Sequence, residues 1–219
     1  MEVISRIGRN RRCECLITFM YEAVNRFLAE SRVEAHFDQL FGTDEWRTLV
    51  TADHAAARRE AIVDLYRRQL IEEASFQYVR TFEMIDQGNR TEYFLYFRTH
   101  SPRGLSKMKE AMWRADPIAG QVFSDRTVSD QMVLIQPTVD LTQLREQLQG
   151  RFRRQGWVSI DQVADFVLKE TAYSESIHLK RSTLGPMERE QPPAVLVVRR
   201  PGACDRAGDY PPGTRLMFV

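Results

Sequence analysis

The sequence predicts a mixed α/β (α+β) protein that is divided into two domains. Segments rich in β-branched and aromatic residues alternate with segments of helical periodicity along the whole chain. This pattern changes across a stretch of weak signal from residue 118 to residue 139, and 219 residues are enough for two small domains. We therefore predict a first domain at residues 1–125 and a second domain at residues 126–219.

The first domain is expected to contain strands, helices and a β-hairpin. Residues 54–74 predict an amphipathic helix, because apolar and charged side chains separate at a helical period. Two β-rich runs flank a turn with Gly88 and Asn89, which predicts an antiparallel hairpin. The second run is apolar from Tyr93 to Phe97, which fits a strand covered on both faces rather than a sheet edge. Strands are expected at residues 13–19, 78–85 and 92–99, and further helices at residues 19–28, 37–42 and 105–115.

The second domain is expected to follow the order helix, helix, helix, strand, loop and strand. Leucine and phenylalanine recur at helical spacing in residues 141–152, and Ser159 opens the next helix with the S-x-x-Q pattern of a capping box. A third helix is expected from about residue 176 to residue 190. Strands at residues 194–198 and 215–219 flank a loop rich in proline and glycine. This order is that of a winged helix-turn-helix domain.

Nucleic acid, and duplex DNA in particular, is the partner that this order predicts, because the later helix of such a domain enters the major groove. Lys180 and Arg181 on this helix can donate to phosphates or to guanine, and Ser176 near its start can hold a phosphate. Arginines of the loop can lie along the phosphate backbone. The predicted contact residues are Ser176, His178, Lys180, Arg181, Arg199, Arg200, Arg206 and Arg215.

The charge of the second domain is compatible with this partner. Residues 141–219 hold 12 Lys and Arg against 9 Asp and Glu, whereas the rest of the chain holds 19 against 21. Because Asp205 and Asp209 offset part of the charge of the loop, we expect modest affinity that depends strongly on salt. The same residues also fit two alternatives: a solvated helix face without a ligand, and a winged helix that only contacts protein or dimerises.

No catalytic, metal or cofactor site is predicted. The sequence has neither a glycine-rich nucleotide loop nor a nucleophile motif, and His100 beside Ser101 is more simply a surface histidine next to a turn-capping serine. Cys13, Cys15 and Cys204 are too few for a closed zinc site without distant histidines, so we expect buried thiols. The chain has no run of about 20 apolar residues and no signal-peptide pattern, so we expect a cytoplasmic protein without membrane contact.

Three segments of the sequence resemble the three-Cys-motif partner protein family. They are Phe-Met-Tyr-Glu-Ala-Val-Asn-Arg-Phe at residues 19–27, Phe-Asp-Gln-Leu-Phe-Gly at residues 37–42 and, most specifically, Met-Lys-Glu-Ala-Met-Trp at residues 108–113. The C-terminal segment is similar to the methyltransferase-associated, GMT-like winged helix-turn-helix domain that accompanies this family. The match covers most of this chain and corresponds to the C-terminal portion of the family's usual length.

This resemblance implies that the first domain is part of a Rossmann-like methyltransferase sheet. Its last strands and helices would be residues 13–116, with the hairpin as the closing edge. The glycine loop that binds S-adenosylmethionine would precede the start of this chain, so neither a cofactor nor a catalytic residue is carried over. Two further functions stay open: the C-terminal part of a methyltransferase-like enzyme, and a protein-interaction or dimerisation module whose unpaired sheet edge is covered by another element.

Overall fold

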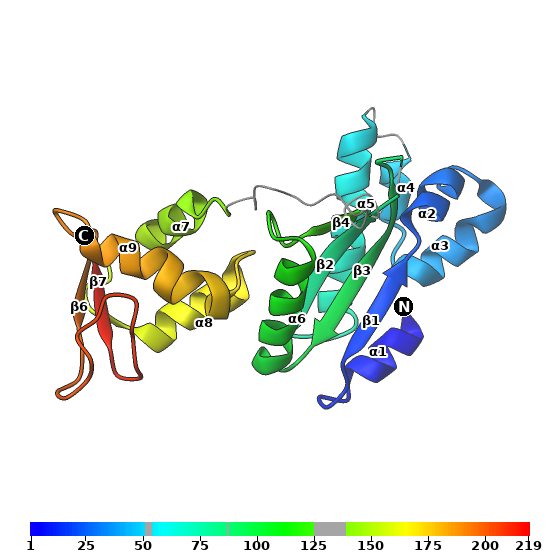
Figure 1. The fold of residues 1–219 in the computed structure, drawn as a ribbon. Coiled ribbons are helices and arrows are strands. Elements are labelled where there is room, and N and C mark those ends of the chain that lie inside the picture. Colours follow the sequence, from blue (N-terminus) through cyan, green and yellow to red (C-terminus); the bar gives the residue numbers. More distant parts are fainter. Residues whose placement is uncertain (51–53, 87, 125–138) are drawn as a thin grey trace. The chain divides into compact units, whose positions relative to one another are not determined.

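The computed structural model describes residues 1–50, 54–86, 88–124 and 139–219, and it divides the chain into two compact units. The first unit contains Met1–Leu105 and the strand that follows Gln121. The second unit contains Ser106–Gly120 and the described residues from Val139 onwards. Each unit combines helices with one small sheet, which confirms the predicted mixed class (Figure 1). The predicted boundary between residues 125 and 126 lies outside the described residues.

The elements of the first unit follow the predicted pattern closely. Its helices are α1 (Glu2–Gly8), α2 (Tyr21–Phe27), η1 (Ser31–Val33), α3 (Glu34–Phe41), α4 (Trp46–Leu49) and α5 (Ala55–Glu72). Its strands are β1 (Cys15–Phe19), β2 (Tyr78–Ile85), β3 (Thr91–Thr99) and β4 (Val122–Ser124). The predicted first strand, the long amphipathic helix and the hairpin are therefore confirmed, whereas α1, η1, α4 and β4 were not predicted.

The sheet of the first unit has the strand order β1-β3-β2-β4. β3 is antiparallel to both of its neighbours, and β2 pairs with β4 in parallel. The apolar strand β3 thus lies inside the sheet, as its sequence predicts. The expectation that the hairpin closes the edge of the sheet is wrong, because both hairpin strands are internal. Among the described strands, the edges are β1 and β4.

An aromatic cluster fills the core between this sheet and the helices of the first unit. The ring of Tyr66 on α5 lies 4.4 Å from that of Phe19 and 5.0 Å from that of Tyr96, measured between centroids. Phe41 at the end of α3 joins the cluster and is fully buried. The face of α5 that is buried is the apolar face predicted from its periodicity.

The second unit begins within helix α6 (Pro102–Ala115), whose residues from Ser106 onwards belong to it. The other elements are α7 (Thr142–Phe152), β5 (Val158–Ser159), α8 (Ile160–Glu170), η3 (Glu175–Leu184), α9 (Gly185–Arg189), β6 (Val195–Val198) and β7 (Arg215–Phe218). The loop between β6 and β7, residues 199–214, is called the C-terminal loop below. All three predicted helices and both predicted strands are confirmed, but the third helix is a π-helix, η3, that continues into α9.

α6 is tied to the second unit by the end of α8. The buried ammonium of Lys109 donates to the backbone oxygens of Val167, Leu168 and Thr171 at 2.8, 3.0 and 3.1 Å. The indole of Trp113 donates to the backbone oxygen of Ala172 at 3.0 Å. The last carbonyls of a helix have no partner within the helix, and a cation placed there also meets the negative end of the helix dipole. Side chains of α6 therefore donate the hydrogen bonds that the backbone oxygens at the C-terminal end of α8 lack within their own helix.

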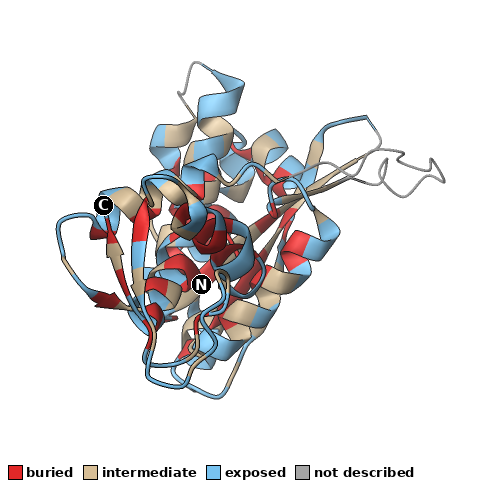
Figure 2. Cartoon of the chain, turned by 60° about the vertical axis from the view of Figure 1, so that its left-hand side comes forward, coloured by how far each residue is buried: buried red, intermediate tan, exposed pale blue. Residues whose placement is uncertain are grey.

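The sheet of the second unit places β7 between β5 and β6, antiparallel to both. The predicted capping box is present at the start of α8, where Gln162 N donates to Ser159 Oγ at 3.1 Å and Ser159 N donates to Gln162 Oε1 at 2.8 Å. Most buried positions (red) lie in the helices and strands, whereas most of the C-terminal loop is exposed (pale blue) in Figure 2. No helix in the described part of the chain is long and apolar enough to cross a bilayer.

Candidate nucleic-acid interface

The helix pair η3 and α9 buries one side and exposes the other. Leu179, Leu184 and Met187 lie in the core of the second unit. Arg181 and Arg189 are exposed on the opposite side. The pair therefore presents basic side chains to solvent because its apolar side chains fill the core.

Arg199 fixes the C-terminal loop against α9. Its side chain is 7% exposed and pairs with Glu188 at 2.7 Å and with Asp205 at 3.0 Å. It also donates to the backbone oxygens of Arg206 and Asp209, each at 3.0 Å. One guanidinium thus joins the helix to three points of the loop, and the conformation of the loop depends on it.

Tyr210 and Lys180 complete this network. The hydroxyl of Tyr210 donates to Glu188 Oε2 at 2.8 Å, and Lys180 Nζ donates to the backbone oxygen of Tyr210 at 2.8 Å. Burial raises the pKa of Glu188, but hydrogen bonds from Arg199 and Tyr210 outweigh this effect and leave the pKa below its ordinary value. Glu188 is therefore the ionised centre of the network.

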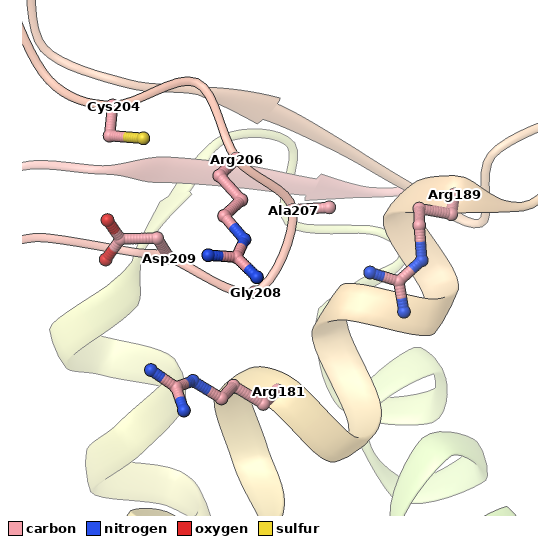
Figure 3. A pocket seen from close by; sticks show the side chains of 7 residues that line it. All are labelled: Arg181, Arg189, Cys204, Arg206, Ala207, Gly208 and Asp209. Carbon is pink, nitrogen blue, oxygen red and sulfur yellow. The ribbon is translucent and has the colours of Figure 1, made fainter.

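A pocket of about 460 Å³ lies between the C-terminal loop and the helix pair (Figure 3). It is lined by Arg181, Arg189, Cys204, Arg206, Ala207, Gly208 and Asp209. In Figure 3, Arg206 extends from the loop towards the helices, and Arg189 reaches down from α9 on the other side. Gly208 has a φ of 92°, a conformation that favours glycine, where the loop passes η3. We call this site the arginine pocket.

The three guanidinium groups of the arginine pocket have no carboxylate partner within the described ranges, since Arg181, Arg189 and Arg206 form no ion pair there. Asp209 is the one acidic side chain that lines the pocket within these ranges. A guanidinium is planar and can donate two parallel hydrogen bonds to a phosphate or a carboxylate. The arrangement is therefore suited to an anion that accepts hydrogen bonds on several sides.

Two of the predicted contact residues are corrected by the structure. His178 is 4% exposed, its Nδ1 accepts from Ser174 N at 3.0 Å, and its ring lies 4.3 Å from that of Trp113. It is a core residue and does not reach a ligand at the surface. Arg199 is not available to a ligand at the surface either, because its guanidinium is buried and pairs with Glu188 and Asp205.

The other predicted contact residues are exposed, but they do not form one site. Ser176 donates to Glu110 Oε1 at 2.8 Å, and this carboxylate would repel a phosphate. Arg200 lies on the exposed part of the C-terminal loop, and Arg215 lies on β7 with its guanidinium 5.9 Å from the ring centroid of Trp157. The arginine pocket brings together only Arg181 and Arg206 from the predicted set.

Arg189 was missed by the sequence prediction. Its signal was present, since it lies in the predicted third helix and is basic. A π-helix closes hydrogen bonds from residue i to residue i+5, so the residues that follow η3 are displaced from the faces that an α-helical period assigns. The side of the helix on which Arg189 lies therefore could not be read from a period of 3.6 residues.

The other residues considered for catalysis or metal binding are His100, Ser101 and the three cysteines. Ser101 Oγ accepts from Gly104 N at 3.2 Å at the start of α6, as predicted for a turn-capping serine, and the ring of His100 stacks on that of Phe76. Cys13 and Cys15 are half-buried and Cys204 is exposed, so the expectation of buried thiols is corrected for all three cysteines. Within the described ranges, no group of three His, Cys, Asp or Glu residues is placed to hold a metal.

The geometry of the arginine pocket is thus the basis for assigning a function. Comparison with protein families, with curated proteins and with solved structures finds no match to this chain.

Proposed function

We propose that the second unit is a winged helix-turn-helix domain that binds duplex DNA through the arginine pocket. The observation that carries the proposal is that Arg181, Arg189 and Arg206, all without an ion pair among the described residues, line one pocket between a helix pair and a loop. The order of the elements from α7 to β7 and the sheet order β5-β7-β6 support the choice of domain. In such a domain η3 and α9 would be the recognition helix and the C-terminal loop would be the wing.

A phosphate backbone fits the pocket better than a small neutral ligand. Most hydrogen bonds between proteins and DNA go to phosphate and sugar, and arginine is the side chain best shaped for them. A helix and a loop that both carry arginine can contact the backbone on either side of a groove. The network around Arg199 supports this function indirectly, because it holds the loop that carries Arg206.

The first test is the double substitution Arg181→Ala with Arg206→Ala in the full chain. We expect duplex affinity at low salt to fall about tenfold for each arginine removed, and the slope of log affinity against log salt to become shallower by about two. Fluorescence anisotropy of a labelled duplex over a salt series measures both quantities. Arg206 is preferred to Lys180 for this test, because Lys180 also holds the backbone at Tyr210.

The matched control is Arg6→Ala with Arg26→Ala. Both arginines are exposed in the first unit and each pairs with a glutamate one helical turn away, so the control removes the same charge from another surface. We expect its duplex affinity and salt slope to equal those of the wild type. The proposal is wrong if the wild-type chain binds duplex without salt dependence or does not bind it, or if both double variants lose the same affinity.

A further inference from the structure

Trp157 is an exposed aromatic residue in a basic stretch of the sequence. Its side chain is 38% exposed, whereas Trp46 is 2% and Trp113 is 6% exposed. It follows Gly156, whose φ of 68° turns the chain from α7 into β5. An indole is normally buried for most of its area, so this position leaves an apolar surface that the core of the second unit does not use.

The neighbouring strand holds a guanidinium beside this indole. Arg215 on β7 pairs in register with Ser159 on β5, two residues after Trp157. The Arg215 guanidinium carbon lies 5.9 Å from the centroid of the indole ring, within the range of a cation–π contact. The sheet therefore sets the backbone position of Arg215 next to the chain segment that carries Trp157.

Three more arginines precede Trp157 in the sequence. Arg151, Arg153 and Arg154 lie at the end of α7 and in the turn that follows, they are exposed, and none forms an ion pair in the described part of the chain. No Asp or Glu occurs from residue 147 to residue 160. Basic residues are favoured at a helix C-terminus by the helix dipole, but this effect does not explain an exposed indole among them. We call Arg151, Arg153, Arg154, Trp157 and Arg215 the tryptophan patch.

We infer that the tryptophan patch binds single-stranded nucleic acid, with an unpaired base stacked on Trp157 and the arginines on its phosphates. An aromatic ring combined with arginines is the chemistry that binds single strands without strong sequence preference. In a duplex each internal base is stacked on both of its neighbours, so a long blunt duplex offers a free base face to the indole only at its two ends. The inference goes beyond the proposed duplex site, and none of these five residues lines the arginine pocket.

Tryptophan fluorescence of the full chain tests this inference directly. Because Trp46 and Trp113 are buried, iodide should quench mainly Trp157. We expect a single-stranded oligothymidine to protect this emission from iodide, and a blunt duplex to leave it accessible. An equal effect of polyglutamate would overturn the inference in favour of an acidic peptide.

Substitution of Trp157 gives the second readout. We expect Trp157→Ala to weaken the binding of oligothymidine between about fivefold and a hundredfold, and Trp157→Phe to restore most of it, because stacking needs an aromatic ring. Both variants should bind blunt duplex like the wild type and melt at the wild-type temperature. If Trp157→Ala binds oligothymidine like the wild type, the inference is wrong, and the effect of Arg181→Ala with Arg206→Ala on duplex affinity still decides the proposed function separately.

Discussion

The surroundings of His178 hold its imidazole in the neutral form. Burial lowers the pKa of this side chain to about 4 from an ordinary value of 6.5, and the positive charge of Lys109 acts in the same direction. Between these two values the unfolded chain binds a proton at His178 that the folded chain does not bind. The stability that His178 contributes is therefore present above pH 6.5 and is lost as the pH falls towards 4.

Substitution His178→Asn should remove this pH dependence. The side-chain oxygen of asparagine can accept from Ser174 N as Nδ1 does, but asparagine does not bind a proton in this range. We expect the wild type to lose about 3 kcal/mol more than the variant between pH 7 and pH 4, as measured by urea unfolding at several pH values. Equal pH dependence in the two proteins would contradict this assignment.

The arginines of the C-terminal loop show why single residues are hard to assign from sequence. Arg199 and Arg200 are adjacent and chemically identical, yet Arg199 is buried in a network and Arg200 is exposed. The difference arises from contacts with Glu188 and Asp205, which are 11 and 6 residues away along the chain. Sequence patterns predict that a loop is basic, but they do not predict which guanidinium a distant carboxylate will take.

At the scale of elements, Lys109 is the main connection between α6 and α8. Its ammonium donates hydrogen bonds to three backbone oxygens at the end of α8. Burial of these oxygens without a hydrogen-bond donor would be unfavourable. Because lysine is usually a surface residue, Lys109 does not mark α6 for burial against α8, and the predicted first domain at residues 1–125 includes α6. The pairing of α6 with α8 is set by contacts across about 60 residues and leaves no local signature.

Substitution Lys109→Met should destabilise the second unit. The side chain stays unbranched, is one atom shorter and loses its charge and its three hydrogen bonds, so we expect the unfolding free energy to fall by about 2 to 4 kcal/mol. Lys107→Met is the control, because Lys107 lies on the same helix, is exposed and pairs with Glu110 at the surface. Its effect should stay below about 1 kcal/mol. Urea unfolding followed by tryptophan fluorescence compares the two, and equal losses would show that Lys109 has no special role.

The elements that could be predicted from the sequence are those whose determining residues lie within a few positions of one another. The capping box at Ser159, the apolar face of α5 and the turn of the hairpin are encoded within a few residues, and all three were predicted. β4 and β5 have three and two residues, too few for a period to be detected, and each forms only because a distant strand pairs with it. The candidate site was half predicted, since its helix and loop were expected but Arg189 and the role of Arg199 depend on tertiary contacts.

At the scale of the whole molecule, the second unit is assembled from two stretches of chain. Ser106–Gly120 precedes the strand β4 of the first unit, and the remaining described part begins at Val139. A cut between residues 124 and 139 therefore separates α6 covalently from α8 and leaves their contacts in place. We expect a protease site inserted there to give two fragments that elute together in gel filtration. Separate elution of the fragments would contradict the contacts of Lys109 and Trp113.

Cleavage between residues 124 and 139 should also change how the melting temperature of the second unit depends on protein concentration. In the intact chain the docking of α6 on α8 is a unimolecular step, so this contact does not make the melting temperature depend on protein concentration. After cleavage, docking becomes an association of two molecules, and the second unit gains stability only as far as mass action keeps the fragments together. Its melting temperature should then fall on dilution, which makes the strength of the contacts made by Lys109 and Trp113 measurable as a dissociation constant.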